Sequence, residues 1–138
     1  MNNFEDINWN VSNSVKILVT KKSFSLQNDF NISFSENNSY KETKKNIDFL
    51  LENFLPSKPH FIKQAHGKKI VNLSKNILLP YVADGLITDK RNQVISILTA
   101  DCMPIVISSI CGSIVCVLHV GRKGAEFNII KNAFNFLN

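Results

Sequence analysis

Residues 99–124 read TADCMPIVISSICGSIVCVLHVGRKG. Two β-rich runs, Met103–Ser108 and Ser113–His119, flank a Cys-Gly-Ser segment that favours a turn. We therefore expect an antiparallel hairpin that turns at residues 110–111. Serine and glycine interrupt the apolar run, so the stretch predicts two short strands of a sheet rather than one membrane-spanning segment.

The predicted hairpin brings a cysteine and a histidine together at its open end. Cys102 faces His119 in this register, with Cβ atoms about 5 Å apart. Cys111 lies at the tip, about 25–30 Å away at about 3.3 Å per residue. Alternation along the second strand puts His119 and Val117 on one face and Cys116 on the other, which predicts a core position for Cys116. A register error of one residue would reverse these faces.

A third candidate ligand lies upstream, in the segment Gln64-Ala65-His66-Gly67. Catalytic zinc takes three side-chain ligands from His, Cys or carboxylate and leaves a fourth position open for water or substrate. His66, Cys102 and His119 would fill those three places. The alternative is structural, because a lone cysteine beside a lone histidine is more often packing, and His66-Gly67 alone is typical of a turn.

Two strands and one helix are expected near the N-terminus. Val15–Thr20 is a β-rich run, and Phe30–Phe34 alternates apolar and polar residues. A capping box at Ser39–Glu42 opens a helix that ends before Pro56. The apolar face of this helix contains Ile47, Leu50, Leu51 and Phe54.

Further strands are expected at Phe61–Ala65, Ile70–Leu73 and Gln93–Thr99, and a tight turn at Asp84-Gly85. The last predicted element is a helix at Glu126–Leu137. Its apolar side contains Phe127, Ile130, Phe134 and Leu137.

The composition is that of one globular domain. At 138 residues, the chain can bury a single core. The net charge of +5 comes mostly from scattered lysines, with arginine only at Arg91 and Arg122, so we expect no nucleic-acid groove. Three cysteines are too few, and odd in number, for a disulfide framework, which favours a reducing cytoplasm. We expect no membrane segment and no leader peptide.

Three other polar residues are expected to be structural. His60 lies between Pro59 and Phe61, and we interpret it as a structural histidine. Asp84 and Asp101 are expected to form turns or to accept hydrogen bonds from the backbone rather than to act in catalysis.

Four motifs occur in order along the chain, at Gln64–Gly67, Ala83–Thr88, Thr99–Pro104 and His119–Gly124. Together they resemble the motifs Gln-x-His-Gly, Ala-Asp-Gly-x-x-Thr, Thr-Ala-Asp-Cys-x-Pro and His-Ala-Gly-Trp-Arg-Gly of the laccase-domain family. Members of that family have been described as multicopper polyphenol oxidases and, later, as zinc-dependent purine nucleoside phosphorylases.

This resemblance implies both a fold and a metal site. The family fold is α+β, with mixed β-sheets layered with helices in an α/β/β/α-type sandwich. The family's ligands carry over to His66, Cys102 and His119, and the resemblance also makes them the catalytic residues. Zinc is the implied metal. Copper fits less well, because a multicopper centre needs many imidazoles and this chain has three histidines.

The implied substrates are a purine nucleoside and phosphate. Family activities include phosphorolysis of adenosine, inosine and methylthioadenosine, and deamination of adenosine. We expect phosphate at Arg122 and Lys123, beside the N-terminus of a helix that begins near Ala125, and we assign Gln64 and Lys22 to substrate or phosphate binding. The family has Trp-Arg where this chain has Arg122-Lys123, and lysine cannot reproduce the bidentate fork of arginine.

The resemblance also bears on chain length and partners. It stops where family members continue, so we expect residues 1–138 to form a single, C-terminally truncated laccase-like domain. A separately encoded C-terminal half or a homo-oligomer would complete it. Two other functions stay open: a catalytically inactive remnant, and a hydrolase acting on a peptidoglycan precursor with Cys102 as nucleophile and His119 as base.

Overall fold

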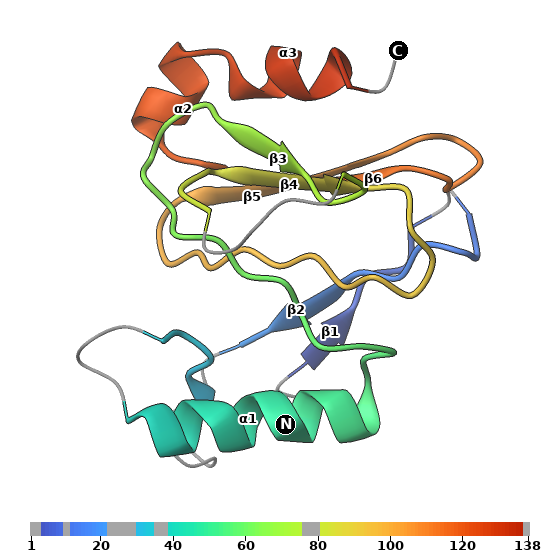
Figure 1. Cartoon of the computed structure of the whole chain (residues 1–138), viewed down its shortest axis with the longest axis vertical. Coiled ribbons are helices and arrows are strands. Elements are labelled where there is room, and N and C mark those ends of the chain that lie inside the picture. Colours follow the sequence, from blue (N-terminus) through green and yellow to red (C-terminus); the bar gives the residue numbers. More distant parts are fainter. Residues whose placement is uncertain (1–3, 10–11, 22–29, 35–38, 76–80, 137–138) are drawn as a thin grey trace. The chain divides into compact units, whose positions relative to one another are not determined.

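The computed structural model describes residues 4–9, 12–21, 30–34, 39–75 and 81–136 (Figure 1). The predicted positions Lys22 and Leu137 lie outside the described residues. The chain divides into two compact units, which are treated separately below: Met1–Asn10 with Lys16–Lys58, and Val11–Val15 with Pro59–Asn138. Among the described residues, no helix combines the length and the apolar character needed to cross a bilayer.

The first unit contains a two-stranded antiparallel sheet and one helix. β1 (Phe4–Asp6) pairs with β2 (Leu18–Thr20), so the strand predicted at Val15–Thr20 is confirmed in its second half. α1 (Tyr40–Asn53) ends before Pro56, as predicted. Its predicted apolar face is only partly buried: Leu51 is half-buried, Phe54 is exposed, and the buried residues are Thr43, Asn46, Ile47 and Leu50.

Two predictions about this unit are wrong. Ser39 precedes α1, but its side chain makes no capping hydrogen bond, so the capping box does not form. The predicted strand Phe30–Phe34 is irregular. Its backbone carbonyl groups accept hydrogen bonds from side chains of α1 instead. Thr43 Oγ1 donates to the backbone oxygen of Ser33 (3.3 Å), and Asn46 Nδ2 donates to that of Asn31 (2.8 Å). The apolar alternation of this segment therefore reports packing rather than strand pairing.

The second unit is built on a four-stranded mixed sheet of order β3-β4-β6-β5. Its strands are β3 (Ile70–Asn72), β4 (Gly85–Thr88), β5 (Met103–Ser108) and β6 (Val115–Val120). β3 and β4 are parallel, and the other two pairs are antiparallel. The predicted hairpin and the strand expected around residues 70–73 are thus confirmed.

The hairpin register differs from the predicted one by two residues. His119 faces Pro104, not Cys102, so Cys102 lies just beyond the paired strands. The loop is longer than expected, since the Ser109 N–H donates to the Ile114 carbonyl (3.0 Å) and Gly112 adopts a positive φ of 71° between them. A shift of two residues preserves the faces of a strand.

Gly85 begins the buried strand β4 and Asp84 directly precedes it, so the tight turn predicted at Asp84-Gly85 does not form. Gly85 is required by close packing, because a Cβ there would lie 2.7 Å from Leu118 Cδ2. The predicted strands Phe61–Ala65 and Gln93–Thr99 also differ, and form only the isolated bridges His60↔Ile95 and Lys63↔Val82.

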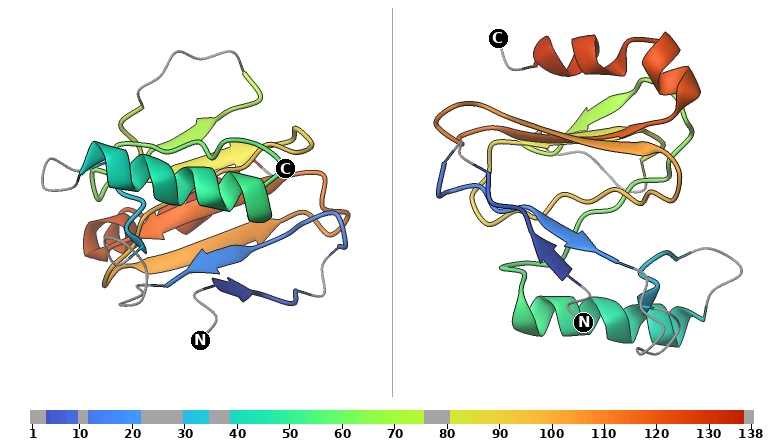
Figure 2. Two further views of the ribbon diagram at one scale, coloured as in Figure 1. Left: turned by 90° about the horizontal axis from the view of Figure 1, so that it is seen from below. Right: turned by 180° about the vertical axis from the view of Figure 1, so that it is seen from behind.

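Both faces of the sheet are covered. α2 (Arg122–Glu126) and α3 (Ile129–Phe134) follow β6, and in Figure 2 they lie over one face while the chain between β4 and β5 runs along the other. Cys116 is fully buried on the helix side, which confirms its predicted core position. The opposite side is formed by Ile62, Val71, Leu73, Tyr81, Ala83, Leu86 and Val117, with Ile95, Ile97 and Val106 packed against them.

The single helix predicted at Glu126–Leu137 is wrong, because the chain breaks between α2 and α3. Asn128 adopts a left-handed conformation (φ 55°) at the break. This break changes which residues of the following turn face the sheet. Ile129 and Ala133 are buried, whereas Phe127, Ile130 and Phe134 of the predicted apolar face are exposed.

Candidate metal centre

The sheet topology brings three distant segments to one edge. Gly85 faces Ile70 in β3 and Leu118 in β6, so the start of β4 lies beside the start of β3 and the end of β6. β5 starts at the same edge because it is antiparallel to β6. His66 shortly before β3, Cys102 directly before β5 and His119 near the end of β6 therefore converge.

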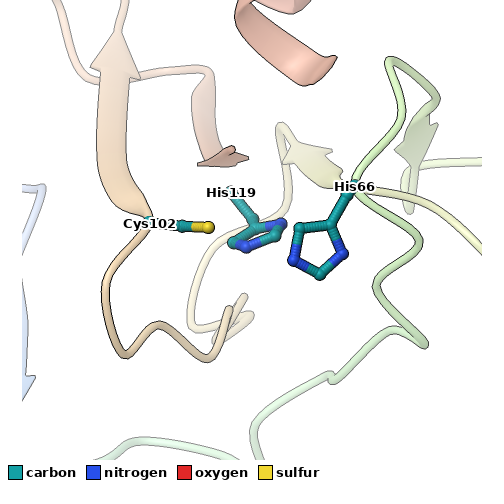
Figure 3. Close-up of side chains that lie close together, drawn as sticks. All are labelled: His66, Cys102 and His119. Atoms are coloured by element: carbon teal, nitrogen blue, oxygen red, sulfur yellow. The ribbon is translucent and has the colours of Figure 1, made fainter. Parts of the chain in front are cut away.

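Cys102 Sγ and the ring nitrogens of His66 and His119 that could bind a metal lie within 4.8 Å of one another. Figure 3 shows the Cys102 thiol directed at the His119 ring, with the His66 ring on its other side. The two imidazoles meet edge to face, with ring centroids 4.7 Å apart. His66 is exposed, Cys102 is half-buried and His119 is 3% exposed, so the cluster runs from the core to the surface.

These three side chains fit a tetrahedral zinc ion. Bonds of about 2.0–2.1 Å to nitrogen and about 2.3 Å to sulfur place tetrahedral ligand atoms about 3.3–3.7 Å apart. The ligand atoms of the three side chains lie up to 4.8 Å apart, which is about 1 Å farther than in a tetrahedral site. Because His66 is at the surface, small side-chain rotations can close that difference. One thiolate and two imidazoles also leave a fourth position for a water or a substrate.

The turn that carries His66 is fixed by one buried carboxylate. His66 has a positive φ of 57°, which is uncommon for a residue with a Cβ. Three successive backbone N–H groups donate to Asp84: Ala65 to Oδ1 (3.1 Å), His66 to Oδ1 (2.8 Å) and Gly67 to Oδ2 (2.7 Å). These hydrogen bonds hold the turn in its left-handed conformation.

Asp84 also contacts the ring of His119. Its Oδ1 lies 3.0 Å from His119 Nδ1, and the His119 N–H donates to the Asp84 carbonyl (2.8 Å). A proton on Nδ1 directs that nitrogen to the carboxylate and leaves Nε2 with a lone pair. Burial alone would raise the pKa of Asp84, but the hydrogen bonds from Gly67, His119, His66 and Ala65 outweigh it and lower the pKa. Asp84 therefore accepts these bonds as an ionised carboxylate.

Gly121 permits the close approach of two of the three side chains. A Cβ at this position would lie 3.1 Å from His66 Cδ2 and 3.2 Å from Cys102 Sγ. The backbone there has φ −84°, which any residue can adopt, so a larger residue would act by crowding these two side chains rather than by backbone strain.

The predicted phosphate-binding residues lie in different settings. Arg122 and Lys123 are exposed in α2, which begins at Arg122 rather than near Ala125, and Arg122 Nε lies 4.0 Å from Glu126 Oε1. The Gln64 side chain bonds to the backbone of Leu98, donating from Nε2 to the carbonyl (2.7 Å) and accepting the N–H at Oε1 (2.8 Å). Gln64 thus ties two irregular segments together, and its substrate role stays a prediction.

The remaining histidine and cysteines are outside this cluster. His60 Nε2 lies 3.4 Å from Gln93 Nε2, and the His60 backbone bridges to Ile95, in keeping with a structural role. Cys111 is exposed in the hairpin loop. Burial raises the pKa of Cys116 to about 12.

Sequence reasoning missed the link between Asp84 and His119. It predicted that Asp84 accepts backbone hydrogen bonds, and the structure confirms this. The sequence does contain a signal for this contact: the apolar residues Leu86 and Ile87, which follow Asp84-Gly85, predict a buried strand. Once β4 is placed beside β6, Asp84 becomes a neighbour of His119.

A family model described as "Multi-copper polyphenol oxidoreductase laccase" matches residues 18–138. The chain is 33% identical over 124 residues to "Purine nucleoside phosphorylase RC0672" of Rickettsia conorii, covering 88% of this chain and 51% of that protein. It is 30% identical over 139 residues to a "Purine nucleoside phosphorylase" of Haemophilus influenzae, covering 94% and 54%. The chain therefore spans about half the length of these curated relatives.

Solved structures share the fold. Protein NMB0706 of Neisseria meningitidis, of family DUF152, superposes with a TM-score of 0.81 at 20% identity, over 99% of this chain and 57% of that one. YlmD of Geobacillus stearothermophilus gives a TM-score of 0.65 at 22% identity, over 75% and 43%. The predicted α+β class with mixed sheets and helices is confirmed.

Proposed function

Because the chain belongs to the multi-copper polyphenol oxidoreductase laccase family, we propose that it acts in purine nucleoside chemistry as a zinc protein. His66, Cys102 and His119 are the proposed ligands and catalytic residues. The observation that carries this proposal is the approach of their ligand atoms to within 4.8 Å. Relatives named purine nucleoside phosphorylase support the substrate class.

The donor set favours zinc over copper. A multicopper centre needs many imidazoles, and of the three histidines His60 lies beside Gln93 outside the cluster. Two imidazoles and one thiolate match a catalytic zinc site with an open position. Bound zinc supplies Lewis acidity there, which polarises an oxygen of water or phosphate.

The protein residues prepare the site for that chemistry. Asp84 Oδ1 lies 3.0 Å from His119 Nδ1, which favours a proton on that nitrogen, and Cys102 must be a thiolate to bind a metal. Arg122 and Lys123 carry exposed positive charges a few residues beyond His119, and we propose that they contact phosphate. α2 has only five residues, so this contact depends on the two side chains rather than on a long helix dipole.

Phosphorolysis is the proposed reaction. A phosphate oxygen forms a bond to C1′ of the ribose, the bond from C1′ to the purine nitrogen breaks, and the departing base takes up a proton. Adenosine, inosine and methylthioadenosine all contain this bond. Deamination of adenosine, in which water replaces the amino group, is the related activity to assay beside it.

A complete catalytic unit needs more polypeptide than this chain, since the curated relatives are about twice as long. We propose that a C-terminal half, encoded separately or in the same gene, or a second copy of the chain completes it. A metal-binding cysteine must stay reduced, so the proposal implies a reducing compartment such as the cytoplasm.

The test is metal analysis combined with a nucleoside panel. Protein purified without added metal should contain about one zinc per chain, and Cys102→Ala should contain none. Release of hypoxanthine from inosine with phosphate should require the zinc-loaded protein, assayed alone and together with the C-terminal half of a relative. Lys123→Ala should raise the phosphate KM and keep the zinc. Absence of zinc from the folded wild-type protein would contradict the proposal.

One observation favours a second candidate, a metal-free Cys–His hydrolase acting on a peptidoglycan precursor. Asp84 orients His119 beside Cys102, as the third group of a nucleophile–base arrangement does. The nearby His66 has no role in that mechanism. Zinc bound stoichiometrically at Cys102 excludes the hydrolase as the resting form, whereas zinc-free protein whose Cys102 forms a covalent adduct with such a precursor would favour it.

A further inference from the structure

One carboxylate, that of Asp84, contacts the backbone around His66 and the ring of His119, which are two of the proposed ligands. Asp84 is 1% exposed and lies at the start of β4, between the turn before β3 and the end of β6. It accepts hydrogen bonds from three backbone N–H groups around His66 and lies 3.0 Å from the ring of His119.

The four contacts are divided between both oxygens. Oδ1 accepts from the Ala65 and His66 N–H groups and contacts His119 Nδ1, and Oδ2 accepts from the Gly67 N–H. An asparagine has the same shape but only one acceptor oxygen. Its amide group would meet either the Gly67 N–H or the pair formed by the His66 N–H and His119 Nδ1. In the first orientation, the amide NH₂ and the Gly67 N–H are two donors facing each other. In the second, the NH₂ faces the His66 N–H, and His119 must lose its Nδ1 proton to accept from it.

We propose that Asp84 is a positioning residue that presets both imidazoles for the metal. It holds the left-handed turn that presents His66, and it keeps the proton of His119 on Nδ1 so that the Nε2 lone pair is free to bind. Metal-ligating histidines commonly donate their second ring N–H to a carboxylate. Here the same carboxylate also fixes the backbone of the other histidine. This inference rests on the proposed function, because it presupposes that the cluster binds a metal.

The experiment compares zinc binding by the wild type, Asp84→Asn and Asp89→Asn. Asp89 is an exposed carboxylate directly after β4, so it is a matched control for the same substitution. Competition titration should show zinc affinity about 10–100-fold lower for Asp84→Asn and within about twofold for Asp89→Asn. Equal zinc affinity in all three proteins would overturn the proposal. If the wild type binds no zinc, the proposed function fails instead.

A second measurement separates positioning from general stability and does not require the variant to fold. Nitrogen-15 spectra of the neutral imidazoles in metal-free wild type should show His119 protonated on Nδ1. An Nε2–H tautomer in the wild type would overturn the proposal. Where Asp84→Asn folds, its His119 should move toward the Nε2–H tautomer, whereas Asp89→Asn should keep the wild-type spectrum.

Discussion

The two ends of the β5–β6 hairpin each carry a cysteine, but in different surroundings. At the open end, Cys102 Sγ lies within 4.8 Å of two imidazole nitrogens, and the His119 ring in turn contacts the buried carboxylate of Asp84. At the loop end, Cys111 is exposed among serine hydroxyls. At the first end, β4 pairs with β6 and the turn that carries His66 lies beside the hairpin, whereas a loop closes the second end. The comparison shows that the chemistry of a thiol is set by what the topology brings beside it.

At the loop end, hydrogen bonds change the pKa of the Cys111 thiol. Cys111 Sγ lies 3.1 Å from Ser113 Oγ and 3.6 Å from Ser109 Oγ. Hydrogen bonding with the Ser113 side chain, and then with that of Ser109, lowers the pKa of Cys111 to about 7. Cys102 instead has the imidazoles of His66 and His119 nearby, which are the other two proposed metal ligands. The same residue type is therefore a proposed ligand at one end and an exposed thiol of lowered pKa at the other.

The largest expected effect comes from removing the thiol at the open end. Cys102→Ala removes one of the three proposed ligands, so zinc affinity should fall by more than about 100-fold, which exceeds the usual effect of a supporting residue. Competition with a chromogenic chelator measures this directly. Cys111→Ala is the matched control and should bind zinc as the wild type does. Equal losses in both variants would show that the two ends do not differ.

The thiol between the two ends tests the core instead. Cys116 is fully buried beneath α3. Cys116→Ser places a hydroxyl in that apolar setting, so the free energy of unfolding should fall by about 2 kcal/mol. Denaturant titration measures this change, with Cys111→Ser as the exposed control. Zinc stoichiometry should be unaffected, and a stability equal to that of the wild type would contradict the assigned burial.

Space at the open end should matter somewhat less. Gly121→Val introduces atoms at 3.1 Å from His66 and 3.2 Å from Cys102, and overpacking of this kind costs about 1–3 kcal/mol. We expect zinc affinity to fall about tenfold, which corresponds to about 1.4 kcal/mol. Ala125→Val, at an exposed position of α2, should leave the affinity unchanged. Wild-type zinc affinity in Gly121→Val would contradict the expectation that a side chain at this position crowds His66 and Cys102.

The smallest effect is expected at the loop end. Ser113→Ala removes the leading hydrogen bond to the thiolate, so the pKa of Cys111 should rise and its thiolate fraction at pH 7 should fall. Alkylation of Cys111 by iodoacetamide, followed by mass spectrometry, should slow about threefold at pH 7. The difference should fade at higher pH, where both forms are ionised. Ser108→Ala is the control, because its hydroxyl donates to the Ser109 carbonyl and not to Cys111.

The sequence predicted the hairpin better than the strands around it. Two β-rich runs with a turn between them are a local signal, and they located β5 and β6 and put Cys102 near His119. The register was shifted by two residues because the loop contains Gly112 in a left-handed conformation. Loop length follows from such backbone detail, which residue patterns report only weakly.

Long-range pairing was the part that the sequence concealed. Gly85 was interpreted as a turn residue, although its lack of a side chain makes room for Leu118 of the neighbouring strand. Without β4, Asp84 could not be placed beside His119. The segments containing Ile62 and Ile97 alternate like strands but pack on the sheet with only isolated bridges, because apolar alternation reports burial and not pairing.

The strand order β3-β4-β6-β5 implies an order of assembly during folding. A hairpin between neighbouring strands closes early, since its contacts are close in the chain. At that stage only two of the three ligands are together. His66 joins them after β4 has inserted between β3 and β6, a step that depends on contacts between distant segments. The proposed metal site would therefore be completed only at the last stage of folding, and free zinc should speed that stage little while slowing its reversal.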